Sequence, residues 1–160
     1  MRNLHLLIQR LADSGVEFVI VGGFAGVLHG SSYVTEDLHI CAVLSTENIG
    51  RLRAALADLD PKHRMTHAKL SFVDHPPEGA PMANLYLETD AGVLDVLGNV
   101  LGVGDFSALA QSAIEVSLFG RKCRVISLET LIRAKEAVGR EKDLLVAKEL
   151  RAIAAKRAGH

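Results

Sequence analysis

The stretch VGGFAGVLHGSSYVTEDLHI, residues 21–40, decides how this sequence folds. It continues a β-branched, apolar run, VEFVIV (16–21), which is typical of a buried strand. Two glycines end that strand, FAGVLHG (24–30) predicts a short helix, and SSYVT predicts a turn. DLHICA (37–42) then predicts a second strand, with Asp37, His39 and Cys41 on one face. The stretch therefore predicts a strand–helix–strand unit.

The rest of the chain adds helices at both ends and strands between them. Helical spacing or caps predict helices over 3–13, 45–59, 128–138 and 141–157, and strand hairpins are predicted over 83–98 and 114–126. LSFVD (70–74) is a candidate for one more strand. Because hairpins make antiparallel pairs, we expect an α/β fold with a small mixed sheet flanked by helices. We expect a core over residues 1–126 and a helical C-terminal segment, 127–160, packed on it.

Composition excludes several classes of protein. The chain carries 18 Lys or Arg and 19 Asp or Glu, so it is not basic throughout, as a protein that coats nucleic acid would be. Residues 133–157 are an exception, with a net charge of +4 against −5 for the remainder. The apolar runs are too short for a membrane helix, so no membrane is expected. Two cysteines make no disulfide framework, which fits a reducing cytoplasm.

A phosphate site is predicted where the first strand meets the helix. Gly22 and Gly23 let a ligand approach the backbone, and the first helical turn offers unpaired N–H groups. The hydroxyl groups of the turn that follows could add donors; they belong to Ser31, Ser32 and Thr35. Each of these glycines and hydroxyl groups also has a purely structural interpretation as a turn former.

Two carboxylates are predicted near this phosphate site. Asp37 begins the second strand, and Asp95 lies in LDVLG (94–98) on a further strand. A purely structural role for Asp95 between Leu94 and Val96 would leave a costly charge near the core, which favours a functional role. Carboxylates beside phosphates call for a divalent cation, and Mg²⁺ prefers carboxylate, phosphate and water oxygens.

These residues resemble the nucleotidyltransferase superfamily related to DNA polymerase beta, and within it the small bacterial AbiEii-type proteins, many of them toxins of toxin–antitoxin pairs. The shared pattern is Val21-Gly22-Gly23, the block that begins with Asp37, and LDVLG with Asp95. ISLETLIRAKEAVGREKD (126–143) is similar to the tail of these proteins. The likeness extends over about residues 15–150.

The resemblance implies a metal-dependent enzyme that moves a nucleoside monophosphate from an NTP to an acceptor hydroxyl. Asp37 and Asp95 would be catalytic and would hold Mg²⁺ or Mn²⁺, with His39 in the second ligand position. Lys135 and Lys142 would contact the nucleotide. The implied acceptor is tRNA, a protein or a small molecule such as an aminoglycoside, and the implied partner is a cognate antitoxin.

His39 departs from the family pattern, which has an acidic residue at this position. Imidazole is a neutral ligand that suits Mn²⁺, Zn²⁺ and other transition metals better than Mg²⁺. Three interpretations stay open, namely loss of transfer, dependence on a softer metal, or activity with one metal. The alternative function is a degenerate, non-catalytic module that binds a nucleotide or a partner.

Overall fold

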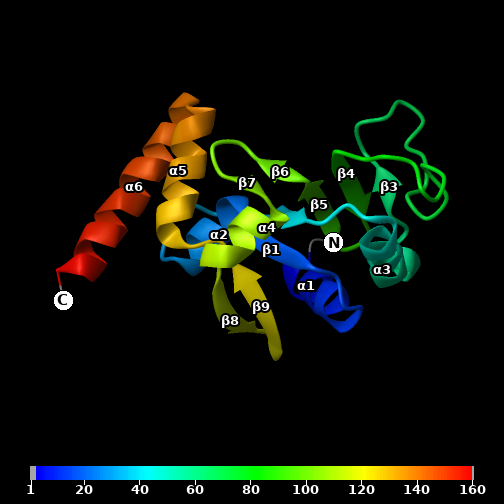
Figure 1. Ribbon diagram of the computed structural model, residues 1–160, viewed down its shortest axis with the longest axis horizontal. Helices are drawn as coiled ribbons and strands as arrows, with labels where there is room; N and C mark the ends of the chain where they lie inside the picture. The colour runs from blue at the N-terminus through cyan, green and yellow to red at the C-terminus, as the bar shows by residue number, and fades with distance from the viewer. Residues whose placement is uncertain (1–2, 160) are drawn as a thin grey trace.

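The computed structural model describes residues 3–159, and a mixed sheet of seven strands runs through its middle (Figure 1). The strand order is β3-β4-β5-β2-β1-β9-β8. The strands are β1 (Phe18–Val21), β2 (Leu38–Ala42), β3 (Lys62–His63), β4 (Asn84–Thr89), β5 (Gly92–Leu97), β8 (Ile114–Leu118) and β9 (Arg121–Val125). A separate short pair is formed by β6 (Asn99–Val100) and β7 (Gly104–Asp105). The predicted α/β class with a mixed sheet is confirmed.

The register of the central strands sets the position of the site. β1 pairs with β2 in antiparallel fashion, which puts Val21 opposite His39. β2 pairs with β5 in parallel, which puts His39 beside Asp95. The end of β1, the start of β2 and the middle of β5 therefore lie side by side in the centre of the sheet, near the end of the strands where α2 begins.

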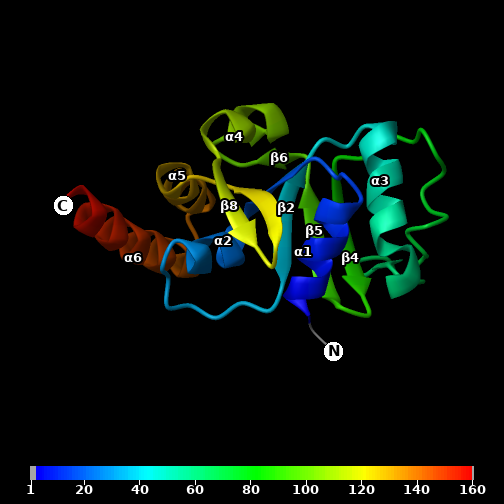
Figure 2. The ribbon, with the colours of Figure 1, turned by 90° about the horizontal axis from the view of Figure 1, so that it is seen from below.

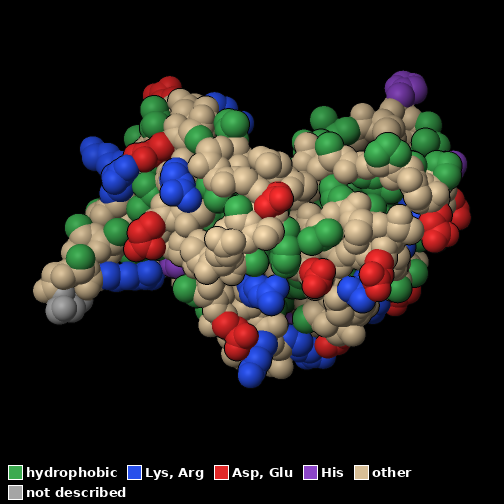
Figure 3. Space-filling view, viewed as in Figure 1, with side chains coloured by type: hydrophobic (Ala, Val, Ile, Leu, Met, Phe, Trp, Pro, Cys, Tyr) green, Lys and Arg blue, Asp and Glu red, His purple; other side chains and the backbone are tan. Residues whose placement is uncertain are grey.

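In the part of the chain that the structure describes, six α-helices flank the sheet. They are α1 (Leu4–Asp13), α2 (Gly22–Leu28), α3 (Thr46–Leu56), α4 (Phe106–Ser112), α5 (Leu128–Val138) and α6 (Glu141–Ala158). α1 and α3 pack together against the sheet at one end of the molecule, and α5 and α6 form a pair at the other end (Figure 2). Figure 3 shows a notch between these two ends. No helix within residues 3–159 has the length and apolar character needed to span a bilayer.

The core is largely aliphatic, as the composition predicts. Fully buried side chains of α1, α3 and the central strands include Leu7, Leu11, Ile20, Ile40, Leu52 and Leu94. The predicted caps also form, because the Ser45 hydroxyl accepts the N–H of Asn48 and the Ser127 hydroxyl accepts that of Thr130. These caps satisfy donors that helix starts leave unpaired.

Two local predictions are wrong. α2 begins at Gly22 rather than at residue 24, because Gly22 adopts φ +70° and turns the chain into the helix at once. LSFVD forms no strand, since only Ser71 makes an isolated bridge, to Lys62. Phe72 is fully buried and its N–H donates to Pro61, so this segment anchors in the core through one side chain rather than through a ladder.

Candidate functional site

His39 and Asp95 are neighbours on adjacent parallel strands. The Nε2 atom of His39 lies 3.2 Å from Oδ2 of Asp95. The Asp95 residue is only 6% exposed, whereas more than a third of the His39 side chain is exposed. The imidazole therefore covers a buried carboxylate at the rim of the sheet.

Arg64 holds the same carboxylate from the other side. Its Nη2 atom lies 2.7 Å from both Oδ1 and Oδ2 of Asp95. The Arg64 backbone N–H donates to the Tyr86 carbonyl, and the guanidinium lies over the Tyr86 ring, 5.7 Å from its centre. The sequence assigns Arg64 no role, because it lies in an irregular segment 31 residues before its partner and belongs to no motif.

These contacts decide the protonation state of Asp95. Burial alone raises the pKa of a carboxyl group, but the hydrogen bonds and positive charges of His39 and Arg64 outweigh it. The pKa of Asp95 lies below its ordinary value as a result. Asp95 is thus an ionised carboxylate with cationic or donor partners on both of its oxygens.

The glycine turn packs directly against this cluster. A Cβ atom on Gly22 would lie 3.0 Å from both Cβ and Nδ1 of His39, at a positive φ. A Cβ atom on Gly23 would lie 3.2 Å from Cβ of Thr35. Gly22 is therefore needed for the close approach of β2, whereas a side chain on Gly23 would require Thr35 to shift by a few tenths of an ångström, whatever ligand the turn also receives.

A pocket of about 290 Å³ lies between this turn and the α5–α6 pair. Four ionisable residues of the α5–α6 segment line it, together with residues of the turn, the following loop and β2. The full lining is Gly23, Ser31, Tyr33, Val34, Thr35, Asp37, His39, Lys135, Arg140, Lys142, Asp143 and Val146. A smaller adjoining pocket of about 170 Å³ includes Gly22 and shares His39, Lys135, Arg140 and Asp143. Most of the predicted site residues therefore line a single hollow.

Asp143 fixes the basic residues of this pocket and was not predicted. Its carboxylate accepts from Arg140 at 2.7 Å and lies 3.8 Å from Nζ of Lys135, while its side chain is only 4% exposed. The hydrogen bonds from Arg140 lower the pKa of Asp143 against the effect of burial. Burial lowers the pKa of Lys135, which Asp143 partly offsets. An acidic residue three positions after an arginine at a helix start is the signal that could have found this pair.

Ser31 and Ser32 face a carboxylate in the structure. The Ser31 hydroxyl donates to Glu149 at 2.6 Å, and both the N–H and the hydroxyl of Ser32 also bond to Glu149. These bonds lower the pKa of Glu149. They also tie the loop after α2 to α6, beside which it runs in Figure 2. A phosphate contact by these serines stays a prediction, and it would require Glu149 to give up its donors.

The donor set does not fit a divalent cation at Asp95 as the side chains lie. Both oxygens of Asp95 already accept hydrogen bonds, and the neighbouring donor is an imidazole rather than a carboxylate. Within residues 3–159, no three His, Cys, Asp or Glu side chains gather as a metal-binding group. Asp37 lines the pocket, but its role as a metal ligand stays a prediction, as does the use of Mg²⁺ or Mn²⁺.

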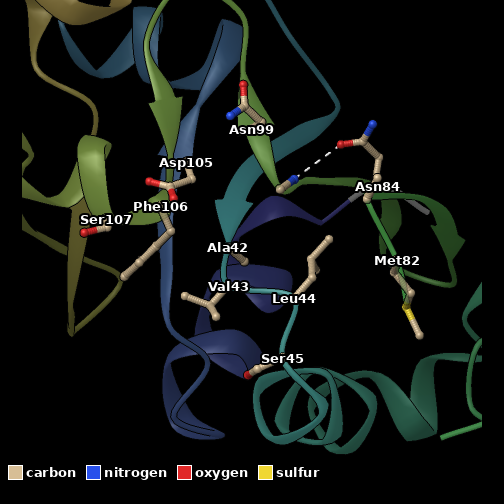
Figure 4. Close-up of a pocket in the computed structure, with 12 residues that line it drawn as sticks. Ala42, Val43, Leu44, Ser45, Met82, Asn84, Asn99, Asp105, Phe106 and Ser107 are labelled. Carbon is tan, nitrogen blue, oxygen red and sulfur yellow. Dashed lines mark hydrogen bonds between the residues drawn. The ribbon is translucent and has the colours of Figure 1, made fainter. Parts of the chain in front are cut away.

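A larger hollow, of about 740 Å³, lies at the carboxyl ends of β2 and β5 (Figure 4). Asp105, Phe106 and Ser107 form one side, and Met82 and Asn84 form the other. Val43 and Leu44 lie between them, and the Asn84 side chain accepts the N–H of Gly98. This hollow is mostly apolar and contains none of the predicted site residues.

No protein-family model matches this chain, and no curated protein matches it by sequence. Solved structures match it along nearly its whole length. The lincosamide antibiotic adenylyltransferase LnuA, solved with lincomycin bound, has 18% identity and a TM-score of 0.63, over 94% of this chain and 95% of that one. The Thermotoga maritima protein TM1012 has 20% identity and a TM-score of 0.56, over 93% and 91% of the two chains.

The antibiotic-resistance factor ANT(2'')-Ia has 16% identity and a TM-score of 0.51, over 98% of this chain and 94% of that one. At these identities the likeness shows the fold, so the nucleotidyltransferase fold expected from the resemblance is confirmed. The AbiEii-type subgroup stays a prediction.

Proposed function

We propose that this protein binds a nucleoside triphosphate in the pocket between the glycine turn and the α5–α6 pair, and transfers its nucleoside monophosphate to an acceptor hydroxyl. The observation that carries the proposal is the convergence of Lys135, Arg140 and Lys142 on one pocket with Gly23 and Asp37. Basic side chains at a glycine turn are the chemistry that a polyphosphate needs. The shared fold with adenylyltransferases supports the same reaction class.

The protein's own residues account for binding and orientation. The three basic side chains neutralise phosphate oxygens, and Asp143 holds two of them in place. The acceptor oxygen bonds to the α-phosphorus, the bond from that phosphorus to the pyrophosphate oxygen breaks, and the hydroxyl proton is lost to water. Both oxygens of Asp95 are engaged by Arg64 and His39, so we assign this carboxylate to orienting them rather than to taking the proton.

The acceptor is proposed from charge. The segment 133–157 has a net charge of +4, which supports a polyanionic acceptor such as tRNA. A toxin role would also allow a protein as acceptor and an antitoxin as partner. The fold neighbours named above include an enzyme solved with a small antibiotic, which gives a third class of acceptor to test.

We also propose a cytoplasmic location, because Cys41 and Cys123 are both free and buried.

The test is a transfer assay with each α-labelled NTP, in Mg²⁺ or Mn²⁺, with total tRNA, a protein extract or a lincosamide as acceptor. We expect label on one acceptor class from the wild type, and loss of that label with Asp37→Ala or Lys135→Ala. The exposed Lys122→Ala variant, remote from the pocket on β9, is the matched control. Label that persists in Asp37→Ala would mean that the site is not responsible.

A binding module without transfer is the second candidate. The contacts of both Arg64 and His39 with Asp95 favour it, because they occupy the carboxylate that the resemblance assigns to catalysis. This candidate predicts that an NTP raises the melting temperature of the wild type without any transfer, and that His39→Asp creates transfer. The absence of a thermal shift with any NTP would contradict both candidates.

A further inference from the structure

The geometry around Asp95 points to a built-in cation at this site. We propose that the Arg64 guanidinium takes the place of a divalent ion at Asp95, so that this carboxylate binds no metal in the wild-type protein. The inference rests on the proposed function, because it concerns the same nucleotide site. Its test measures metal binding and does not require transfer.

The contact geometry is the first argument. One nitrogen of Arg64 lies 2.7 Å from both carboxylate oxygens, and His39 approaches one of them at 3.2 Å. Asp95 is 6% exposed, so it has few other directions from which an ion could approach. A buried carboxylate with a charged hydrogen-bond donor is already satisfied, and a metal would have to displace that donor.

The position of Arg64 in the fold is the second argument. Its segment continues β3, whose Lys62 and His63 pair with Glu88 and Leu87 of β4. The Arg64 backbone N–H then donates to Tyr86. The arginine therefore directly follows an edge strand, and its backbone is bonded to Tyr86, the direct antiparallel partner of Asp95. This backbone bond to the sheet fixes the start of the Arg64 side chain next to the carboxylate.

The unpaired Nε of Arg64 is the third argument. This nitrogen is buried and, among residues 3–159, has no hydrogen-bond partner. The guanidinium therefore already leaves one buried donor unpaired, and an ion that displaced it from Asp95 would also break the charged hydrogen bonds of its Nη2 atom. The charge of Asp95 is then balanced by Arg64, and Lys135, Arg140 and Lys142 are the cations that line the nucleotide pocket.

The experiment titrates Mn²⁺ against the protein without nucleotide, with free Mn²⁺ followed by electron paramagnetic resonance. We expect the wild type and Asp95→Asn to bind Mn²⁺ equally weakly, with any Kd above about 1 mM. A wild-type site that is at least about tenfold tighter than this and is lost in Asp95→Asn overturns the proposal. This comparison holds even if other variants fail to fold.

The second arm opens the site by Arg64→Gln combined with His39→Asp. We expect this double variant to bind Mn²⁺ at least about tenfold more tightly than the wild type, and Asp95→Asn in the same background to abolish the gain. Arg121→Ala is the matched control, because it removes an arginine that pairs with Asp13 far from the site. A folded double variant that binds no more Mn²⁺ than the wild type means that Arg64 is not what excludes the ion, and overturns the proposal.

Failure here is distinguishable from failure of the proposed function. Tight binding of Mn²⁺ at Asp95 in the wild type would refute the built-in cation and leave nucleotide transfer intact. The absence of any thermal shift with NTP would refute the nucleotide pocket and leave the metal titration valid.

Discussion

Two buried carboxylates lie at the candidate site, and their partners come from very different distances along the chain: Asp143 lines the pocket, whereas Asp95 contacts His39, which lines it. Asp143 is held by Arg140, three residues away, and by Lys135 on the preceding helix. Asp95 is held by Arg64, 31 residues away, and by His39 on the neighbouring strand. The helical pair is a local motif, whereas the sheet cluster exists only once four strands have formed. We therefore expect the two clusters to respond differently to mutation.

The largest effect is expected at the sheet cluster. Asp95→Asn leaves Arg64 partly buried without its counter-charge, so the free energy of unfolding should fall by about 2 kcal/mol in urea denaturation. Adding Arg64→Gln should recover part of this loss, because the unpaired charge is then absent. If the double variant loses more free energy of unfolding than the two single variants lose together, the Arg64–Asp95 pair is not the source of the effect.

The helix cluster should affect ligand binding more than stability. Asp143→Asn releases Arg140 and Lys135 from their counter-ion, and we expect a loss of about 1 kcal/mol in stability. NTP affinity, measured by calorimetry, should fall several-fold, because the loss of fixed positions for Arg140 and Lys135 outweighs the removal of one negative charge from the pocket. The exposed pair of Arg151 and Glu136 on the outer face of the helices is the control, and Glu136→Gln should leave NTP affinity unchanged. Equal losses from both variants would contradict a positioning role for Asp143.

Acid should weaken both clusters. Asp95 and Asp143 both have a pKa below the ordinary value in the folded protein, so each stabilises the fold at pH values above the unfolded pKa of about 3.9. That stability is lost as the pH falls through the folded pKa values. The urea midpoint of the wild type should therefore drop steeply below about pH 4, and less so for Asp143→Asn. A variant with an unchanged pH profile would show that Asp143 does not contribute.

The same contrast explains how much of the structure the sequence could predict. The strand at 37–42, the hairpin at 83–98 and the serine caps follow from local patterns, and the structure confirms them. The pairing of β2 with β5 depends on a crossover, so no local pattern predicts that His39 lies beside Asp95. Arg64 was missed because nothing within ten residues of it marks a site. The contacts of Asp95 with Arg64 and His39 join residues far apart in the sequence, so no local pattern predicts them.

The site residues differ in the same way. Gly22 and Gly23 were predicted as a phosphate cradle, and the structure gives them a further reason, because His39 and Thr35 pack where their Cβ atoms would lie. Lys135 was predicted from the family tail and lines the pocket. Its counter-ion Asp143 was within the same quoted tail but carried no assignment. The net charge of +4 over residues 133–157 does not show that Asp143 pairs with two of the basic residues in that segment.

The smallest expected effect concerns Glu149, which separates the structural from the functional interpretation of Ser31 and Ser32. Glu149→Gln removes a negative charge beside the pocket and weakens its hold on both hydroxyl groups. If these hydroxyls contact phosphate, NTP affinity should rise about twofold, by loss of repulsion and release of donors. Glu115→Gln, on the distant β8 hairpin, is the control. An unchanged or lower affinity in Glu149→Gln would assign the two serines to anchoring the loop on α6, and would leave Lys135, Arg140 and Lys142 as the phosphate contacts.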